Sequence, residues 1–256
     1  MNYLPSPVIA TPYYTDIARS LVPNVFPVNK FGKNGGVPAT LEDVWDGSAV
    51  YEYLADDTFA TMYISSDAAG DQSLTYDVTG IDSDYNYSTV TVTTDASDGR
   101  TFVALTSGAT DNKWWRVFRA LNTSGTAAAG NVYISKDNTD AGGNGIPDTV
   151  ADIQIKILIG NEQTLMALWT CPTGYTAYIT NYYASTSANK TTAICLFVRP
   201  FGGVFNVKGA ININQGSMSY RFDFPVSIAA KSDVAMRASA SGGGGVVAAG
   251  FDLFYE

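Results

Sequence analysis

The sequence predicts an all-β protein, an antiparallel β-sandwich or jelly roll made of two β units and preceded by an extended N-terminal arm. Short stretches alternate apolar and polar residues, and they are rich in the β-branched and aromatic types that favour strands. Clusters of Gly, Asp, Asn and Ser separate these stretches at regular intervals, which is typical of sandwiches. With 256 residues, 46% of them hydrophobic, the chain can bury a large core.

Residues 1–45 form the predicted arm. Prolines at the density seen before residue 40 oppose helices and central strands, and only Tyr14–Val22 could form a turn or two of helix. A solvated tail would not carry so many apolar side chains, so we expect the arm to pack on its own body or on a neighbour. The predicted partner-binding residues are Tyr13, Tyr14, Leu21, Val25, Phe26, Phe31 and Trp45.

Residues 46–140 form the first predicted β-sandwich unit. Strands are expected at Ser88–Thr94, Arg100–Thr106 and Lys113–Leu121, with turn signals between them. The densest cluster of turn residues, Ser135–Thr149, is interpreted as the boundary between the two units.

Residues 150–256 form the second predicted unit, a jelly-roll-like β-sandwich. Its first strand alternates cleanly, with Ile153, Ile155, Ile157 and Ile159 on one face. Later stretches carry alternating aromatics, as in Tyr220, Phe222 and Phe224. About eight such stretches in succession, joined by longer connections, fit a jelly roll.

Charge and hydropathy exclude two classes of partner. The formal net charge is −9 and the basic residues are scattered, whereas binding to nucleic acid needs clustered Lys and Arg. No apolar run is long enough to predict a membrane span. The first residues lack the basic and apolar regions of a signal peptide, so we expect synthesis and assembly in the cytoplasm.

The residue inventory argues against catalysis. The chain contains no histidine, which rules out a Ser-His-Asp or Cys-His mechanism within one chain and a His-ligated metal. Most acidic residues are Asp in turn signals, and no spacing singles out a pair of carboxylates for sugar hydrolysis. We therefore expect no catalytic residues and no cofactor.

Cys171 and Cys195 lie in apolar stretches, either as buried free thiols or as a bridge between neighbouring strands.

Two groups of residues could nevertheless bind ligands. Asp137, Asp140, Asn144 and Asp148 offer oxygen donors between glycines, which would suit calcium, although a plain turn cluster explains them equally well. Trp114 and Trp115 lie in a strand that alternates aromatics with cations. They could stack on sugar rings as surface aromatics, or the strand could be packed on both faces.

Several stretches together resemble a widespread group of virion proteins of tailed bacteriophages. They include VNKFGKN at 28–34, EDVWDG at 42–47, RVFRA at 116–120, GNEQTLMALWTCPTGYTAYIT at 160–180, VRPFGGVFNVK at 198–208 and AAGFDLFYE at 248–256. The resemblance spans nearly the whole chain, and its motifs are structural. The chain departs from the group at 35–41, where the group often has more acidic residues.

The resemblance implies a capsid decoration, or cement, protein on the outside of a phage head. Its implied partners are the major capsid protein or other virion proteins and further copies of the chain, with a homotrimer favoured. Extended arms of such proteins clamp neighbouring shell subunits. The alternative is a tail, fibre or receptor-binding virion protein that recognises host glycans.

Overall fold

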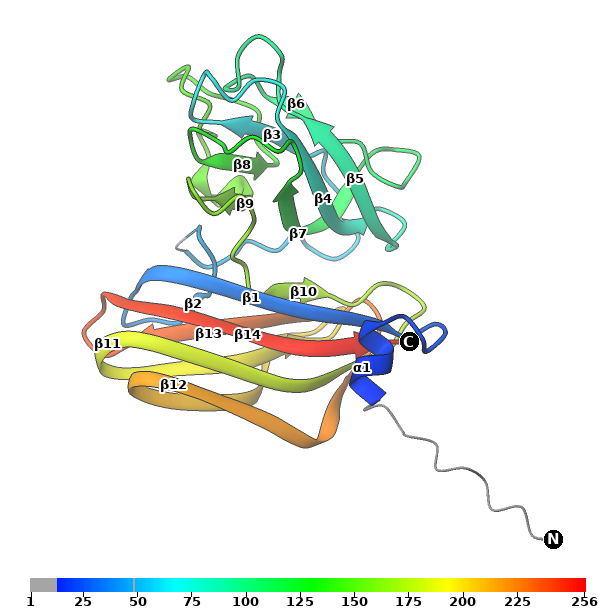
Figure 1. Ribbon diagram of the computed structural model, residues 1–256, viewed down its shortest axis with the longest axis vertical. Helices are drawn as coiled ribbons and strands as arrows, with labels where there is room; N and C mark the ends of the chain where they lie inside the picture. The colour runs from blue at the N-terminus through cyan, green and yellow to red at the C-terminus, as the bar shows by residue number, and fades with distance from the viewer. Residues whose placement is uncertain (1–12, 48) are drawn as a thin grey trace, which may run out of the picture.

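The computed structural model describes residues 13–47 and 49–256, with the backbone alone at position 188. It confirms the all-β prediction, because antiparallel sheets make up nearly all of the regular structure. Figure 1 shows two stacked bodies. The upper body contains residues 49–165, and the lower body contains residues 13–45 and 166–256. Among the described residues, no helix is long and apolar enough to span a bilayer.

The upper body is a small sandwich of two sheets. Its first sheet has the order β6-β3-β8-β9 and its second the order β5-β4-β7. The elements are β3 (Tyr63–Ser66), β4 (Thr75–Asp82), β5 (Tyr87–Thr93), β6 (Val103–Ala104), β7 (Trp114–Asn122), β8 (Val132–Ser135), the 3-10 turn η1 (Val150–Asp152) and β9 (Ile153–Ile157). Strand β7 is buried over most of its length, because it faces the upper core on one side and the lower body on the other.

The lower body is a larger sandwich built around one long hairpin. Its strands are β1 (Phe26–Val37), β2 (Glu42–Asp43), β10 (Leu168–Thr170), β11 (Ala177–Arg199), β12 (Asn206–Ile228), β13 (Asp233–Ala240) and β14 (Gly245–Tyr255). The first half of β11 pairs with β14 and the second half with β13, while β12 follows β11 along both halves. The two halves of the sheet stack: a Cβ added at Gly32 in β1 would meet Val44 O at 2.1 Å and Ala167 N at 2.4 Å.

The structure places residues 26–45 differently from the predicted arm. Strand β1 pairs with β14 from Phe26–Tyr255 to Val37–Gly245, and β2 pairs with β13. Helix α1 (Tyr13–Ala18) lies against the same sheet, with Ile17 buried. The reason is that β14 would otherwise expose an unpaired edge, which β1 covers. Residues 1–12 of the predicted arm lie outside the described residues.

The boundary between the two bodies also differs from the predicted one. Strand β9 pairs with β8 and therefore belongs to the upper body, although it follows the turn cluster at 135–149. Its buried isoleucines, Ile153, Ile155 and Ile157, complete the upper core. The turn cluster is thus a loop within the upper body, and the chain returns to the lower body after residue 165.

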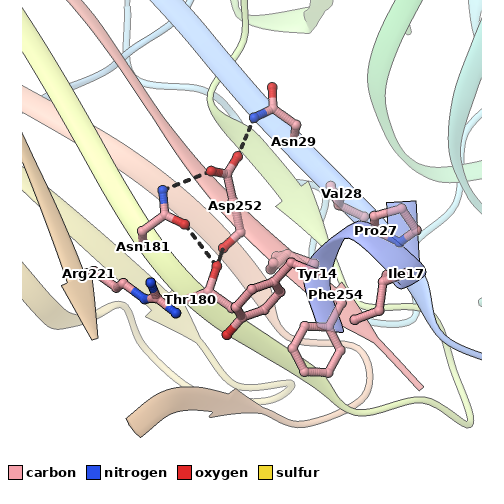
Figure 2. A pocket seen from close by; sticks show the side chains of 11 residues that line it. Tyr14, Ile17, Pro27, Val28, Asn29, Thr180, Asn181, Arg221, Asp252 and Phe254 are labelled. Atoms are coloured by element: carbon pink, nitrogen blue, oxygen red, sulfur yellow. Dashed lines mark hydrogen bonds between the residues drawn. The ribbon is translucent and has the colours of Figure 1, made fainter. Parts of the chain in front are cut away.

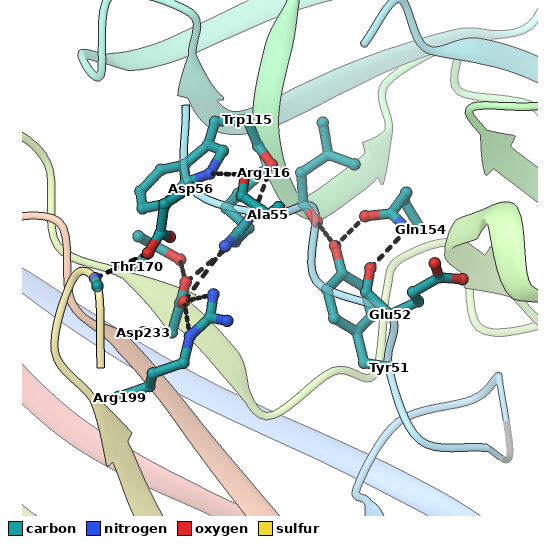
Figure 3. A network of polar contacts seen from close by, with 12 residues as sticks. Tyr51, Glu52, Ala55, Asp56, Trp115, Arg116, Gln154, Thr170, Arg199 and Asp233 are labelled. Atoms are coloured by element: carbon teal, nitrogen blue, oxygen red, sulfur yellow. Dashed lines mark hydrogen bonds and ion pairs between the residues drawn. The ribbon is translucent and has the colours of Figure 1, made fainter. Parts of the chain in front are cut away.

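Buried ionic groups join the two bodies (Figure 3). Arg116 of β7 contacts Asp233 of β13 through Nε–Oδ1 at 3.1 Å, and the two side chains are 2% and 1% exposed. Asp233 also accepts hydrogen bonds from Thr170 Oγ1 at 2.6 Å and Arg199 Nε at 2.9 Å. The guanidinium of Arg116 lies 4.1 Å from the centroid of the Trp115 ring. The buried carboxylate of Asp233 is therefore compensated by two guanidinium groups and a hydroxyl.

A second buried cation, Lys30 of β1, reaches the upper body. Its Nζ donates a hydrogen bond to the carbonyl oxygen of Phe118 in β7. Burial, together with the nearby charge of Arg119, lowers the pKa of Lys30 to about 7. Nearby, Arg237 pairs with Asp43 at 2.9 Å, although burial still raises the pKa of that carboxyl. The junction is therefore polar and sensitive to charge.

Candidate binding surface

One candidate site is a groove on the outer face of the lower sheet, beside α1 (Figure 2). It has a volume of about 420 Å³ and is formed by α1, β1, β11, β12 and β14. Its lining includes the side chains of Tyr14, Asn29, Asn181, Arg221, Asp252 and Phe254. Strand alternation explains the set, because residues two apart on each strand share the outer face.

The floor of the groove is polar and internally satisfied. Asp252 accepts hydrogen bonds from the amide of Asn29 and from Asn181 Nδ2, the latter at 2.8 Å. Thr180 Oγ1 donates to the main-chain oxygen of Asp252 at 3.1 Å. These bonds fix the carboxylate and both amides in place, so the floor is preorganised.

The rim of the groove is aromatic. Tyr13 and Tyr14 of α1 lie 6.2 and 6.5 Å from Phe254, measured between ring centroids. Phe254 also stacks on Tyr178 at 5.2 Å. The guanidinium of Arg221 lies 5.6 Å from the centroid of the Tyr14 ring. The rim therefore offers aromatic faces and one cation to a partner.

Strand β12 bulges beside this groove, in a segment that we call the β12 arch (residues 222–225). Val226 pairs with Ile179 and Arg221 with Asn181, so Thr180 alone faces the four residues of the arch. A bulge that contains a proline suits an exposed edge, because Pro225 has no N–H to offer a ladder. Phe224 stands on this arch with 89% of its surface exposed.

The predicted partner-binding residues divide into two groups. Tyr13, Tyr14, Leu21, Phe26 and Phe31 are exposed on the lower body, at 40–64%. Val25 and Trp45 are buried, at 8% and 4%, and are therefore unavailable to a partner. Trp45 packs edge-on against Tyr51 and donates from Nε1 to Ala49 O at 2.8 Å. Its burial follows from its place where the chain passes from the lower to the upper body.

Trp114 and Trp115 are not surface aromatics. Both side chains are fully buried, and this corrects the sugar-stacking hypothesis for them. Trp114 donates from Nε1 to Thr106 O at 3.0 Å, and Trp115 supports Arg116 at the junction. The alternative from the sequence, a strand packed on both faces, is correct.

The predicted calcium loop uses its oxygens to close turns. Asp137 accepts from Thr139 N at 2.9 Å and Thr149 N at 3.0 Å, and Asp148 accepts from Ala141 N. Asp140 and Asn144 accept from the main-chain N–H groups of Gly145 and Ile146. Within residues 13–47 and 49–256, no three acidic or thiol side chains lie close enough to share a metal. The oxygens of the loop are therefore used in hydrogen bonds within it, which include Asx turns at Asp137 and Asn144.

The two cysteines are free thiols. Cys171 is buried and Cys195 is half-buried, and burial raises the pKa of each thiol. Of the two alternatives that the sequence leaves open, free thiols and a bridge between strands, the structure has the free thiols.

Sequence reasoning missed Arg221, Asp252 and Phe224 as members of one surface. The alternation of Tyr220, Phe222 and Phe224 indicates a strand with an apolar face. Pro225 was the signal that this strand could not be central, and it could have pointed to an exposed aromatic segment.

Comparison with known proteins gives no relative that defines a family. No family model and no curated protein matches the chain. Among solved structures, the crystal structure of PBSX exported protein XepA is 9% identical, over 90% of this chain and 84% of that one, with a TM-score of 0.19. The structure of infectious bursal disease virus Gt strain is 11% identical to this chain, over 96% of this chain and 78% of that one, with a TM-score of 0.23. The structure of the Gx strain of the same virus is 9% identical, over 90% of this chain and 74% of that one, with a TM-score of 0.19. Likenesses at these TM-scores do not establish a common fold.

Proposed function

We propose that the chain is a non-enzymatic structural protein of a tailed-phage virion, which binds the outside of the head as a cement or decoration protein. Its partners are the major capsid protein or other virion proteins, together with further copies of itself. The resemblance of stretches throughout the sequence supports this assignment. The structural observation that carries it is the exposed apolar surface of the lower body, at α1 and the β12 arch.

The two-body architecture suits a mechanical role. The buried Arg116–Asp233 pair ties the upper body to the lower one, so a load on one is transmitted to the other. A shell protein of this kind acts through many shallow contacts repeated by symmetry, and each contact needs only modest affinity. Rigid sandwiches keep the contacting side chains in place and lower the entropy cost of each contact.

The contact with the shell is assigned to residues 1–12 and to the exposed apolar side chains of the lower body. Deleting residues 1–12 tests the first part, and loading of the truncated protein onto particles is the measurement. We expect loading to fall. Normal loading would remove the leading segment from the proposal and leave the lower body as the contact.

Copy number per particle tests the location directly. Quantitative mass spectrometry of purified virions should give hundreds of copies, and heads that lack the protein should burst more easily on heating. A few copies at a single vertex would contradict a cement role and favour a tail position.

The groove beside α1 favours the second candidate, a virion protein that recognises host glycans. The amides of Asn29 and Asn181 and the carboxylate of Asp252 line the same groove as the ring of Tyr14, and a site for a sugar combines polar groups with an aromatic face in this way. Calorimetric titration with glycans, comparing the wild type with Asn181→Ala, would detect such binding. If neither the wild type nor Asn181→Ala released or absorbed heat on titration with glycans, this second candidate function would be ruled out.

A further inference from the structure

The strongest unexplained feature is an exposed phenyl ring beside a groove that could receive one. Phe224 is 89% exposed on the β12 arch, far more than any other exposed aromatic side chain among the described residues. The arch adjoins the groove, since Arg221, the residue before the arch on the same strand, lines the groove. Figure 1 shows the second half of β12 approaching α1, and the contact between Arg221 and Tyr14 confirms it.

A projection and a cavity on one surface allow identical chains to bind each other. In an assembly of identical chains, the residue that inserts and the pocket that receives it come from the same sequence. The groove has a volume of about 420 Å³, which is large enough for a phenyl ring, and a ring that enters it can pack against the aromatic rim of Tyr14 and Phe254 above the polar floor.

The charges of this surface also suit a second copy. The chain as a whole carries −9, so two copies repel each other over most of their surfaces. On β12, however, Arg221 and Asp223 are both exposed and have opposite signs. Within the part of the chain that the structure describes, neither makes an ion pair. Arg221 of one copy can therefore meet Asp223 of another.

We propose that the β12 arch and the groove beside α1 form a contact between two copies of this chain, with Phe224 of one copy seated in the groove of the other. Arg221 and Asp223 at the edge of the contact pair across it. The contact closes a dimer if it is reciprocal, and it closes a ring if it runs head to tail. The inference deepens the proposed function, because it names one partner of the apolar surface on which that function rests.

Sedimentation of the purified full chain over a range of concentrations tests the contact. We expect the wild type to self-associate and Phe224→Ser to raise its dissociation constant about thirty-fold or more, as for a buried aromatic anchor. Because the ring is exposed in the single chain, the melting temperature of the variant should match the wild type. The matched control is Ile159→Ser, since Ile159 is 60% exposed but lies on the upper body.

Charge reversal tests the orientation of the contact. Arg221→Glu and Asp223→Lys should each weaken self-association about ten-fold, and the double variant should return to within about three-fold of the wild type. Because Arg221 also contacts Tyr14 in its own chain, the recovery in the double variant is what identifies the pairing between copies.

Three results would overturn the inference. The first is a wild type that stays monomeric at every concentration, and the second is equal weakening by Phe224→Ser and Ile159→Ser. The third is an oligomer that survives Phe224→Ser but dissociates when residues 1–12 are deleted, which would make the leading segment the occupant of the groove. None of these measurements uses virions, so their outcome is independent of the location on the phage.

Discussion

The two bodies of this protein use their aromatic side chains in opposite ways. In the upper body, Trp114 and Trp115 are fully buried, and loop aspartates close the surface. Asp71, for example, accepts from Ala129 N at 2.7 Å and Gly130 N at 3.1 Å. The upper body thus exposes few large apolar side chains, although its core continues into that of the lower body.

The lower body leaves much of its apolar surface open. Most of the large exposed apolar side chains belong to it: Tyr13, Tyr14, Leu21, Phe26, Phe31, Leu41, Phe201, Val204, Val207, Met218, Tyr220 and Phe224. They gather on elements at the edge of the sandwich, α1 and β12 above all. A patch of this kind on an otherwise well-packed protein marks a surface for another polypeptide.

The contrast between the two surfaces shows that hydropathy alone does not decide which side chains this chain buries. Charged side chains are buried between the bodies, and an aromatic ring is exposed on the outside. The surface between the bodies contains Arg116, Asp233 and Lys30, whereas the surface facing outward contains Phe224. A polar junction is costly to open because it leaves buried charges uncompensated. An apolar outer surface gains from any partner that covers it.

The largest effect is expected where the two bodies meet. Replacing Asp233 by Ala leaves Arg116 buried without its counter-charge, and this should cost about 3–5 kcal/mol of the free energy of unfolding. The bodies should then unfold separately. Urea titrations followed by tryptophan fluorescence and by far-UV circular dichroism should give transitions that no longer coincide.

The control for this variant is Asp98→Ala, which removes the partner of Arg100 in a surface loop of the upper body. Exposed pairs of this kind contribute little, so the melting temperature should not change. If the two variants were equally stable, the ionic junction would not hold the bodies together, and the comparison between them would fail.

The next effect concerns Lys30 and depends on pH. Its pKa is about 7 in the folded chain, against 10.5 for the ordinary side chain, so between these values the unfolded chain binds more protons. Stability should therefore rise as the pH increases from about 7 to about 10, because deprotonating the amine for folding costs progressively less. Below about pH 7 the penalty is constant and on the order of a few kcal/mol.

Lys30→Met removes this penalty. The variant should be more stable than the wild type at neutral pH, and the difference should shrink toward pH 10, as measured by urea midpoints across the range. Lys208→Met is the matched control, because Lys208 is exposed on β12. A constant difference between Lys30→Met and the wild type at all pH values would show that the amine does not titrate in this window.

The upper body was the more predictable half, because its strands follow one another along the chain. Alternation at 88–94 and 113–121 corresponds to β5 and β7, and most of the turn signals lie in loops. Its last strand was assigned to the other unit, since the turn cluster at 135–149 looks like a linker although Asp137 and Asp148 close it into a compact loop. Strand β4 was not predicted, because Gly80 and the aspartates at its end look like a turn.

The lower body was harder to predict because its pairing is non-local. Strand β1 pairs with β14, more than two hundred residues away, and no local pattern indicates that partner. Glycines and prolines made residues 26–45 look like an arm. The groove was unpredictable for the same reason, because Tyr14, Asn181 and Asp252 come together only once β1, β11 and β14 have paired.

The smallest expected effect on stability comes from two glycines of β1, and it tests whether this strand packs against the opposite half of the lower sandwich. A Cβ at Gly32 would meet the backbone of Val44 and Ala167, whereas a Cβ at Gly35 has nothing within 4 Å. Gly32→Ala should therefore destabilise the protein by about 1–3 kcal/mol, through overpacking that the backbone cannot relieve. Gly35→Ala should stay within about 0.5 kcal/mol of the wild type. Urea unfolding of the two variants measures the difference. Equal stability would mean that β1 does not stack on the opposite half of the sandwich in solution, and that the lower body is even more open than its exposed aromatics indicate.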